Sequence, residues 1–180
     1  RRQRQMCIRD RQGSTVNKYN NYGYFGDYAP VSRDLAPFYA AAKNIDINVN
    51  ICGNPSNLFA QTDKITIYPR LQLNELKPIE DKTNVLVFLC NRKGGQIPGK
   101  IYQYSATYKT ILFILDGTDE DKKVLKSYFE QFNRYIFCEN TVEDIERAIK
   151  LIENNDFGNV KNEPIDEFNP AKTIMKVLEG

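Results

Sequence analysis

Strand-like and helix-like patterns of hydrophobic residues alternate along this chain from Tyr22 onwards. Hydrophobic and polar residues alternate strictly over residues 45–51, which predicts a half-buried strand near a sheet edge. The almost unbroken apolar runs at 85–89 and 110–115 predict central strands covered on both faces. Further strands are predicted at 22–26, 64–68 and 135–138, and helices at 34–44, 73–79, 98–107, 119–132 and 141–154. This alternation predicts an α/β fold, a Rossmann-like parallel sheet flanked by helices and joined by right-handed crossovers.

Prolines and capping residues set limits on these helices. Pro37 falls in the first turn of a helix capped by Asp34, where its missing N–H is not needed. Pro78 is predicted to limit the weak helix over 73–79. Thr141 begins a segment that resembles a capping box, so a helix should start there.

The two ends of the chain are set apart from this alternating region. Residues 155–168 are polar and irregular, as expected of a linker, and Asn169 and Pro170 would cap a final helix whose apolar side must rest on something. We therefore expect a non-native tail at 1–11, a truncated lead-in at 12–21, a Rossmann-like domain at 22–154, and a linker with a C-terminal helix at 155–180.

The first eleven residues, RRQRQMCIRDR, resemble the translation of a transposon sequencing adapter. The alternative is a basic tail that binds nucleic acid. Five arginines against one aspartate give this segment a charge of +4, so the net charge of +2 becomes −2 for the rest of the chain. The basic balance is therefore no evidence for a nucleic-acid partner, and we expect none. The adapter interpretation also predicts a metagenomic fragment, the back part of a longer protein.

Cysteine and histidine usage bears on metal sites and on the compartment. Cys52, Cys90 and Cys138 lie far apart without a C-x-x-C motif, so we expect buried thiols in a reducing cytoplasm rather than a metal or a disulfide. The chain has no histidine, the commonest metal ligand and general base near neutral pH. No apolar run approaches the ~20 residues of a membrane span, and the charged N-terminus is unlike a signal peptide.

The segment Ile97-Pro98-Gly99-Lys100-Ile101-Tyr102-Gln103-Tyr104 carries the strongest chemical signal. It follows one central strand and a glycine-bearing loop, and it opens a helix at Pro98. A strand, a loop of free N–H groups and a helix start together make a seat for a phosphate anion.

Three interpretations of this segment remain. Residues 94–100 match the G-x-x-x-x-G-K phosphate loop, but Ile101 replaces the Ser or Thr that holds Mg²⁺, and Pro98 removes one N–H. A degenerate P-loop domain is therefore the weakest alternative. A purely structural glycine loop between two core strands is the second. The third interpretation is a family resemblance.

Residues 22–180 resemble the C-terminal, nucleotide-sugar-binding domain of bacterial GT-B glycosyltransferases, especially the retaining glycosyltransferase family 4. Residues 24–28 are similar to that domain's first strand and turn, and residues 51–53 to its second strand with the usual glycine. Residues 97–112 are similar to the family's P-x-K segment, which ends in a core strand. The final helix resembles the family's last helix, which crosses back to the other domain.

The resemblance implies a donor site at the carboxyl ends of the strands. The diphosphate would meet the amides of Gly99 and Lys100, the Lys100 ammonium would offset its charge, and Gly26 would let the backbone approach it. The family's two glutamates align with Gly95 and Gln103. Gln103 retains hydrogen-bonding groups for the ribose hydroxyls, whereas Gly95 offers no carboxylate near the sugar.

Arg33 and Lys43 are only loose candidates for the basic pair that many active members carry, and the catalytic residues stay unassigned. No metal or cofactor is expected, since the nucleoside diphosphate sugar is itself the donor substrate.

The resemblance implies transfer of a sugar from a nucleoside diphosphate donor to a saccharide or lipid-linked acceptor, as in capsule, exopolysaccharide or lipopolysaccharide synthesis. The acceptor would bind a missing N-terminal domain, so this chain alone should be inactive. We expect a cytoplasmic enzyme at the inner face of the cell membrane, with any peripheral membrane association made through the missing domain. The alternative is a non-catalytic nucleotide-binding or interaction module of Rossmann type.

Overall fold

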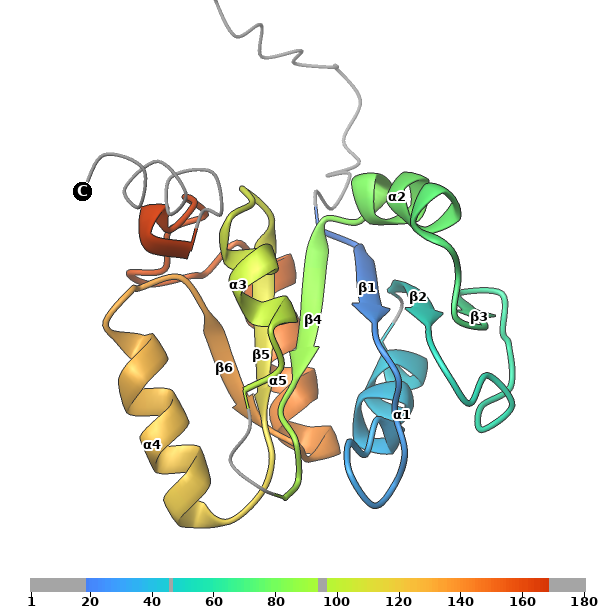
Figure 1. The fold of residues 1–180 in the computed structure, drawn as a ribbon, viewed down its shortest axis with the longest axis horizontal. Helices are drawn as coiled ribbons and strands as arrows, with labels where there is room; N and C mark the ends of the chain where they lie inside the picture. The colour runs from blue at the N-terminus through green and yellow to red at the C-terminus, as the bar shows by residue number, and fades with distance from the viewer. Residues whose placement is uncertain (1–18, 46, 94–96, 169–180) are drawn as a thin grey trace, which may run out of the picture.

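The computed structural model describes residues 19–45, 47–93 and 97–168, which form one open parallel sheet with helices on both faces (Figure 1). The strands are β1 (Asn21–Phe25), β2 (Asn48–Cys52), β3 (Ile65–Tyr68), β4 (Val85–Leu89), β5 (Thr110–Leu115) and β6 (Ile136–Glu139). Their order across the sheet is β3-β2-β1-β4-β5-β6, and every neighbouring pair is parallel. The predicted Rossmann-like α/β fold is confirmed. The chain order reverses between β1 and β4.

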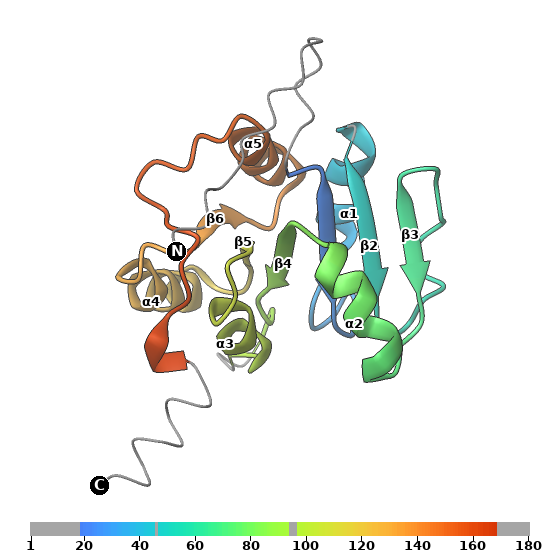
Figure 2. The same cartoon turned by 90° about the horizontal axis from the view of Figure 1, so that it is seen from above.

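The helices divide between the two faces of the sheet. They are α1 (Ala36–Asn44), α2 (Leu73–Lys82), α3 (Lys100–Ser105), α4 (Asp119–Glu130) and α5 (Val142–Glu153), with a 3₁₀ helix η1 (Asp166–Phe168) near the end of the described chain. Helices α1 and α5 cover one face, whereas α2, α3 and α4 lie over the other (Figure 2). No helix in the described part of the chain is both long and apolar enough to cross a bilayer.

Strands β4 and β5 are buried along their whole length, which explains their unbroken apolar sequence; β4 is central in the sheet, whereas β5 lies next to the edge strand β6. Every residue of β4 and β5 is buried, and both strands have the predicted bounds. On β5, Leu112 and Ile114 pack towards α1 and α5, whereas Ile111, Phe113 and Leu115 pack towards α3 and α4. Neither face of these strands can therefore be polar.

Helix α2 corrects one prediction, because it does not end at Ile79, just after Pro78, but runs on to Lys82. Proline removes one hydrogen bond within the helix. The end of the helix is supported from outside, because the Lys109 Nζ donates to the carbonyl oxygens of Glu80 at 2.6 Å and of Asp81 at 3.0 Å. That support comes from a residue distant in the sequence, so local pattern could not reveal it.

Other helix ends differ from prediction by only a few residues. Helix α1 begins two residues after Asp34, whose Oδ1 accepts a hydrogen bond from the Ala36 amide at 3.1 Å. Thr141 caps α5, as predicted, by accepting from the amide of Asp144. Helix α3 is shorter than the predicted 98–107, since Gly99 is its N-cap and it ends at Ser105.

Residues 155–168 are mostly irregular, as predicted, but they lie against the folded domain. The Ile165 amide donates to the carbonyl of Ser105 at 2.9 Å. The ring of Phe168 contacts those of Tyr102 and Phe132, with centroid distances of 4.9 and 5.1 Å. The tail at 1–11 and the final helix predicted at 169–180 lie outside the described residues.

Candidate functional site

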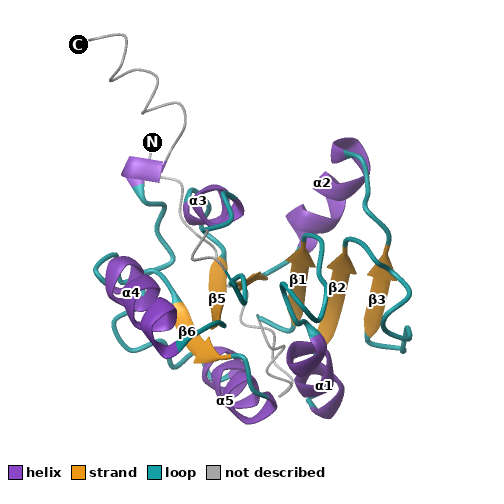
Figure 3. Ribbon diagram, turned by 60° about the horizontal axis from the view of Figure 1, so that its bottom comes forward, coloured by secondary structure: helices purple, strands orange, loops and turns teal. Residues whose placement is uncertain are grey.

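The reversal of chain order between β1 and β4 creates a cleft at the carboxyl edge of the sheet, the edge that Figure 3 brings forward. Loops leave adjacent strands in opposite directions at such a switch point and leave room for a ligand. A cavity of about 360 Å³ opens beside the switch point, over the ends of β1, β2 and β3. It is lined by Phe25, Gly26, Asp27, Arg33, Cys52, Gly53, Arg70, Leu71, Leu76 and Lys100. A smaller hollow of about 50 Å³ continues it towards β4 and shares Phe25, Gly26, Arg33 and Lys100.

Two glycines form the floor of the cleft. The Gly26 amide donates to the Cys52 carbonyl at 2.9 Å, so the loops after β1 and β2 touch. A Cβ on Gly53 would lie 1.9 Å from the carbonyl oxygen of Gly26, so only glycine fits there. The atoms nearest to a Cβ on Gly26 would be the Nη1 of Arg33 and the hydroxyl oxygen of Tyr24, each at 3.7 Å. Close packing therefore requires Gly53, whereas a Cβ at Gly26 would make only ordinary van der Waals contacts with Arg33 and Tyr24.

Lys100 directs its ammonium into this cleft. Its Nζ donates to the Phe25 carbonyl at 2.5 Å, at the end of β1, and lies 4.0 Å from the Glu80 carboxylate. The rings of Phe25 and Tyr104 lie 5.7 and 5.9 Å from the same atom. Burial lowers the pKa of Lys100, and the Glu80 charge opposes that shift. The charged form is thus poorly solvated, and an anion in the cavity would favour it.

Two arginines bring further positive charge to the cleft. Arg33 comes from the loop after β1, and its Nε is buried without a hydrogen-bond partner in the part of the chain that the structure describes. Arg70 comes from the loop after β3, where its guanidinium pairs with Asp27. Asp27 also accepts from the Asn54 amide at 3.0 Å. Two loops and the start of α3 therefore each supply one cation.

The predicted site residues on α3 are placed differently from one another. Gly99 is the N-cap of α3, and a Cβ there would have nothing within 4 Å, so no packing constraint explains this glycine. Gln103 is exposed and lines a separate hollow of about 110 Å³ between α2 and α3. Tyr104 borders both that hollow and the cleft. The structure thus brings Gly26 and Lys100 together but sets Gln103 apart, and Gly95 lies outside the described residues.

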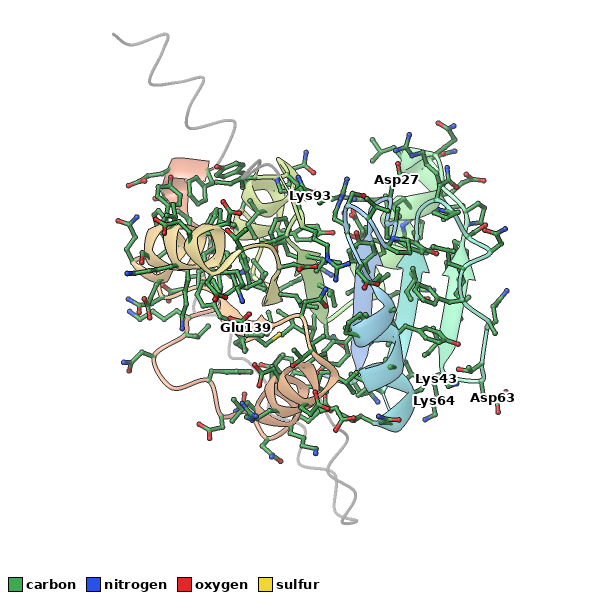
Figure 4. All side chains as sticks on the ribbon, turned by 90° about the horizontal axis from the view of Figure 1, so that it is seen from below. Asp27, Lys43, Asp63, Lys64, Lys93 and Glu139 are labelled. Carbon is green, nitrogen blue, oxygen red and sulfur yellow. The ribbon has the colours of Figure 1, made fainter. Side chains whose placement is uncertain are left out.

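The two loosely predicted basic residues are also separated. Arg33 lines the cleft, whereas Lys43 lies in the last turn of α1 and borders another hollow together with Lys64. Figure 4 shows Lys43 and Lys64 side by side, away from Asp27. Because a crossover helix runs antiparallel to the strand before it, the end of α1 lies towards the opposite edge of the sheet. Lys43 therefore cannot share an anion with Arg33.

Sequence reasoning missed Arg70 and the packing role of Gly53. Arg70 follows directly after the strand predicted at 64–68, and the carboxyl ends of parallel strands share one edge of a sheet. That signal was present in the sequence. The contact between Gly53 and Gly26 depends on the pairing of β1 with β2, which strand patterns alone do not fix.

The comparisons with known proteins concern the fold. No protein-family model matches the chain, and no curated protein sequence matches it. The structure is similar to the crystal structure of UDP-N-acetylglucosamine 2-epimerase, with a TM-score of 0.50 and 10% identity over 96% of this chain and 44% of that chain. It is also similar to the spinosyn rhamnosyltransferase SpnG, with a TM-score of 0.52 and 13% identity over 89% of this chain and 45% of that chain.

A third match, the glycosyltransferase SnogD from Streptomyces nogalater, has a TM-score of 0.42 and 12% identity over 93% of this chain and 46% of that chain. The chain thus spans less than half the length of each of these proteins. The first two likenesses support a GT-B-like Rossmann domain, and at such identities the likeness is one of fold.

Proposed function

We propose that this domain is the nucleotide-sugar-binding half of a glycosyltransferase, and that the switch-point cleft holds the diphosphate of the donor. The observation that carries the proposal is the convergence of Arg33 and Arg70, from two loops, and Lys100, from the start of α3, around a cavity with a glycine floor. A diphosphate is compact and strongly negative, and it suits guanidinium forks and an ammonium group.

The likenesses of fold support this substrate class. The two structures with the higher TM-scores are named for a nucleotide sugar and for the transfer of a rhamnosyl group. In open α/β sheets, ligands bind outside the carboxyl ends of the strands at the switch point, where Arg33 and Lys100 lie.

The chain's own residues would bind and neutralise the leaving diphosphate. The Lys100 ammonium and the Arg33 guanidinium would stabilise the charge that develops as the sugar departs. The amides of Gly99 and Lys100 would add donors at the cleft rim. Gln103 would reach the ribose only if the nucleoside extends along α3 towards the neighbouring hollow.

Transfer itself would need groups that a second domain supplies. We propose that the acceptor, a saccharide or lipid-linked saccharide, binds such a domain, and that transfer takes place at the cytoplasmic face of the membrane. On this proposal the chain binds the donor but transfers no sugar alone.

A non-catalytic nucleotide-binding module is the second candidate, and one observation favours it. Among the described residues that line the large cavity, Asp27 is the one carboxylate, and it is paired with Arg70. Acid–base chemistry therefore has no free carboxylate there, whereas anion binding needs only the cations. Nucleotide binding without sugar transfer by the full-length protein would favour the module.

The test is a titration of the domain with UDP, GDP and pyrophosphate, followed by backbone amide NMR. We expect the amides of Gly26, Arg33 and Lys100 to shift together, and that of Lys43 to stay unchanged as an internal control. Shifts that cluster elsewhere, or binding that requires Mg²⁺, would refute the assignment of the donor site.

A further inference from the structure

The loop after β1 is closed into a tight turn that carries Arg33. The amides and carbonyls of Ala29 and Arg33 bond reciprocally, at 3.0 and 2.8 Å, and the Ser32 amide also donates to the Ala29 carbonyl at 3.0 Å. This turn sets the position of the Arg33 side chain above Gly26. Whatever holds the turn therefore holds Arg33.

Arg92, two residues beyond the buried Cys90 that follows β4, contacts this turn at three points. Its backbone amide donates to the Ser32 carbonyl at 2.7 Å, and its Nη1 donates to the Pro30 carbonyl at 2.8 Å. Its Nη2 lies 3.3 Å from the Asp34 carboxylate. One residue from the far side of the switch point thus bonds to both flanks of the Arg33 turn.

The next two strands each add one residue to this arrangement. Asp116, after β5, lies 3.5 Å from the Nε of Arg92. Asn140, after β6, donates from its Nδ2 to Asp116 at 2.8 Å and to the Asp34 carbonyl at 2.9 Å. We call Arg92, Asp116 and Asn140 the brace. It joins the carboxyl ends of three strands to the turn after a fourth.

We infer that Arg92 is a positioning residue for the anion site, because through the brace it fixes the turn at residues 29–33 and holds the Arg33 guanidinium over the cleft. The inference rests on the proposed function for its ligand. Ion pairs at exposed positions contribute little to global stability, and 41% of the Arg92 side chain is exposed. Its guanidinium constrains local geometry instead, because it bonds to the Pro30 carbonyl and the Asp34 carboxylate on the two sides of Arg33.

A double-mutant cycle tests the link from Arg92 to Arg33, with inorganic pyrophosphate as the probe. Arg33→Gln should weaken pyrophosphate binding about tenfold, and Arg92→Gln about three- to tenfold. If Arg92 acts only through Arg33, the double variant should bind no more weakly than Arg33→Gln alone. Arg147→Gln is the matched control, because Arg147 pairs with Asp144 on the surface of α5 and also removes one positive charge. It should leave the affinity unchanged.

Amide hydrogen exchange tests the brace without any ligand. In Arg92→Gln, the amides of Ala29 and Arg33 should exchange on the order of tenfold faster, while that of Phe113 in β5 should not change. Unchanged exchange in the turn, or additive losses in the cycle, would overturn the inference. If the wild-type domain bound no pyrophosphate, the proposed anion site would fail and with it the link to binding, while exchange would still decide whether the brace holds the turn.

Discussion

Two lysines bond to backbone carbonyls at different edges of the sheet, with different results. Near the amino edge, the Nζ of Lys109 donates to Glu80 at 2.6 Å, to Asp81 at 3.0 Å and to Thr83 at 2.6 Å. At the carboxyl edge, the Nζ of Lys100 donates to the Phe25 carbonyl at 2.5 Å and faces the cavity. An ammonium has three donors, so the protein occupies all those of Lys109 and leaves Lys100 with capacity for a ligand.

Burial lowers the pKa of both lysines, so charge or burial alone cannot tell them apart. The number of protein acceptors around each ammonium can. A cation whose donors are all used within the fold supports structure, and in this chain it closes the end of α2 beyond Pro78. A cation with few partners beside a cavity is placed to bind an anion.

The largest effect is expected from Lys109→Met. Removal of the ammonium leaves three carbonyls at the end of α2 without this donor, which should cost about 2 kcal/mol of unfolding free energy. Pyrophosphate affinity should stay at the wild-type value, because Lys109 is not among the residues that line the cleft. Urea unfolding and isothermal titration measure the two quantities. Equal losses of unfolding free energy and of pyrophosphate affinity would mean that the cleft at one edge of the sheet depends on Lys109 at the other.

The same substitution at Lys100 should give the opposite result. Lys100→Met should weaken pyrophosphate binding by about 1.4 kcal/mol, or tenfold. The Lys100 ammonium donates to one backbone carbonyl, that of Phe25, whereas that of Lys109 donates to three. The unfolding free energy should therefore change by no more than about 0.5 kcal/mol. A strongly destabilised Lys100→Met with normal affinity would reverse the assignment of the two lysines.

The pH dependence of UDP binding should show the same distinction more weakly. A bound anion favours the ammonium form of Lys100, so affinity should fall as the pH rises through its lowered pKa. Burial raises the pKa of Tyr24 and of Cys52 to about 12, so neither ionises below about pH 10. Affinity measured between about pH 7.5 and 10, above the second phosphate ionisation, should decline in the wild type. In Lys100→Met, the part of this decline that is due to Lys100 should be missing. Identical pH profiles of UDP affinity for the wild type and the variant would contradict this prediction.

The smallest effect is expected at Gln103, which lies outside the cleft. Gln103→Ala should not change pyrophosphate binding, and it should weaken UDP binding by less than about 0.5 kcal/mol, a loss that reports ribose contact. Calorimetry with both ligands separates the two cases. A loss with pyrophosphate would show that the hollow between α2 and α3 belongs to the anion site.

The fold could be predicted from sequence where local pattern determines it. The bounds of β4 and β5 follow from burial on both faces, which imposes an unbroken apolar run. The end of α2 could not be predicted, since Lys109 supports it from outside the helix. Distant contacts of this kind leave no periodic signal.

The candidate site was only partly accessible to the same reasoning. Gly26 and Lys100 were assigned to the site by the family resemblance, and the structure places both at the cleft. The resemblance also assigned Gln103 to the site. Residues three apart on a short helix differ in height by about 4.5 Å, and here Lys100 and Gln103 line different hollows. Arg33 and Arg70 both reach the cleft because of how the loops after β1 and β3 fold over the sheet.

The contact between Gly53 and Gly26 has a mechanical consequence. The Gly26 carbonyl lies so close to Gly53 that no methyl group fits between them. The loops after β1 and β2 therefore cannot slide over one another and form one rigid unit, which we call the plate. Any closure around a ligand must then come from the sides of the cleft. The Arg70 loop is one such side, since Arg70 is held to the plate by a surface ion pair with Asp27 that an incoming anion can replace.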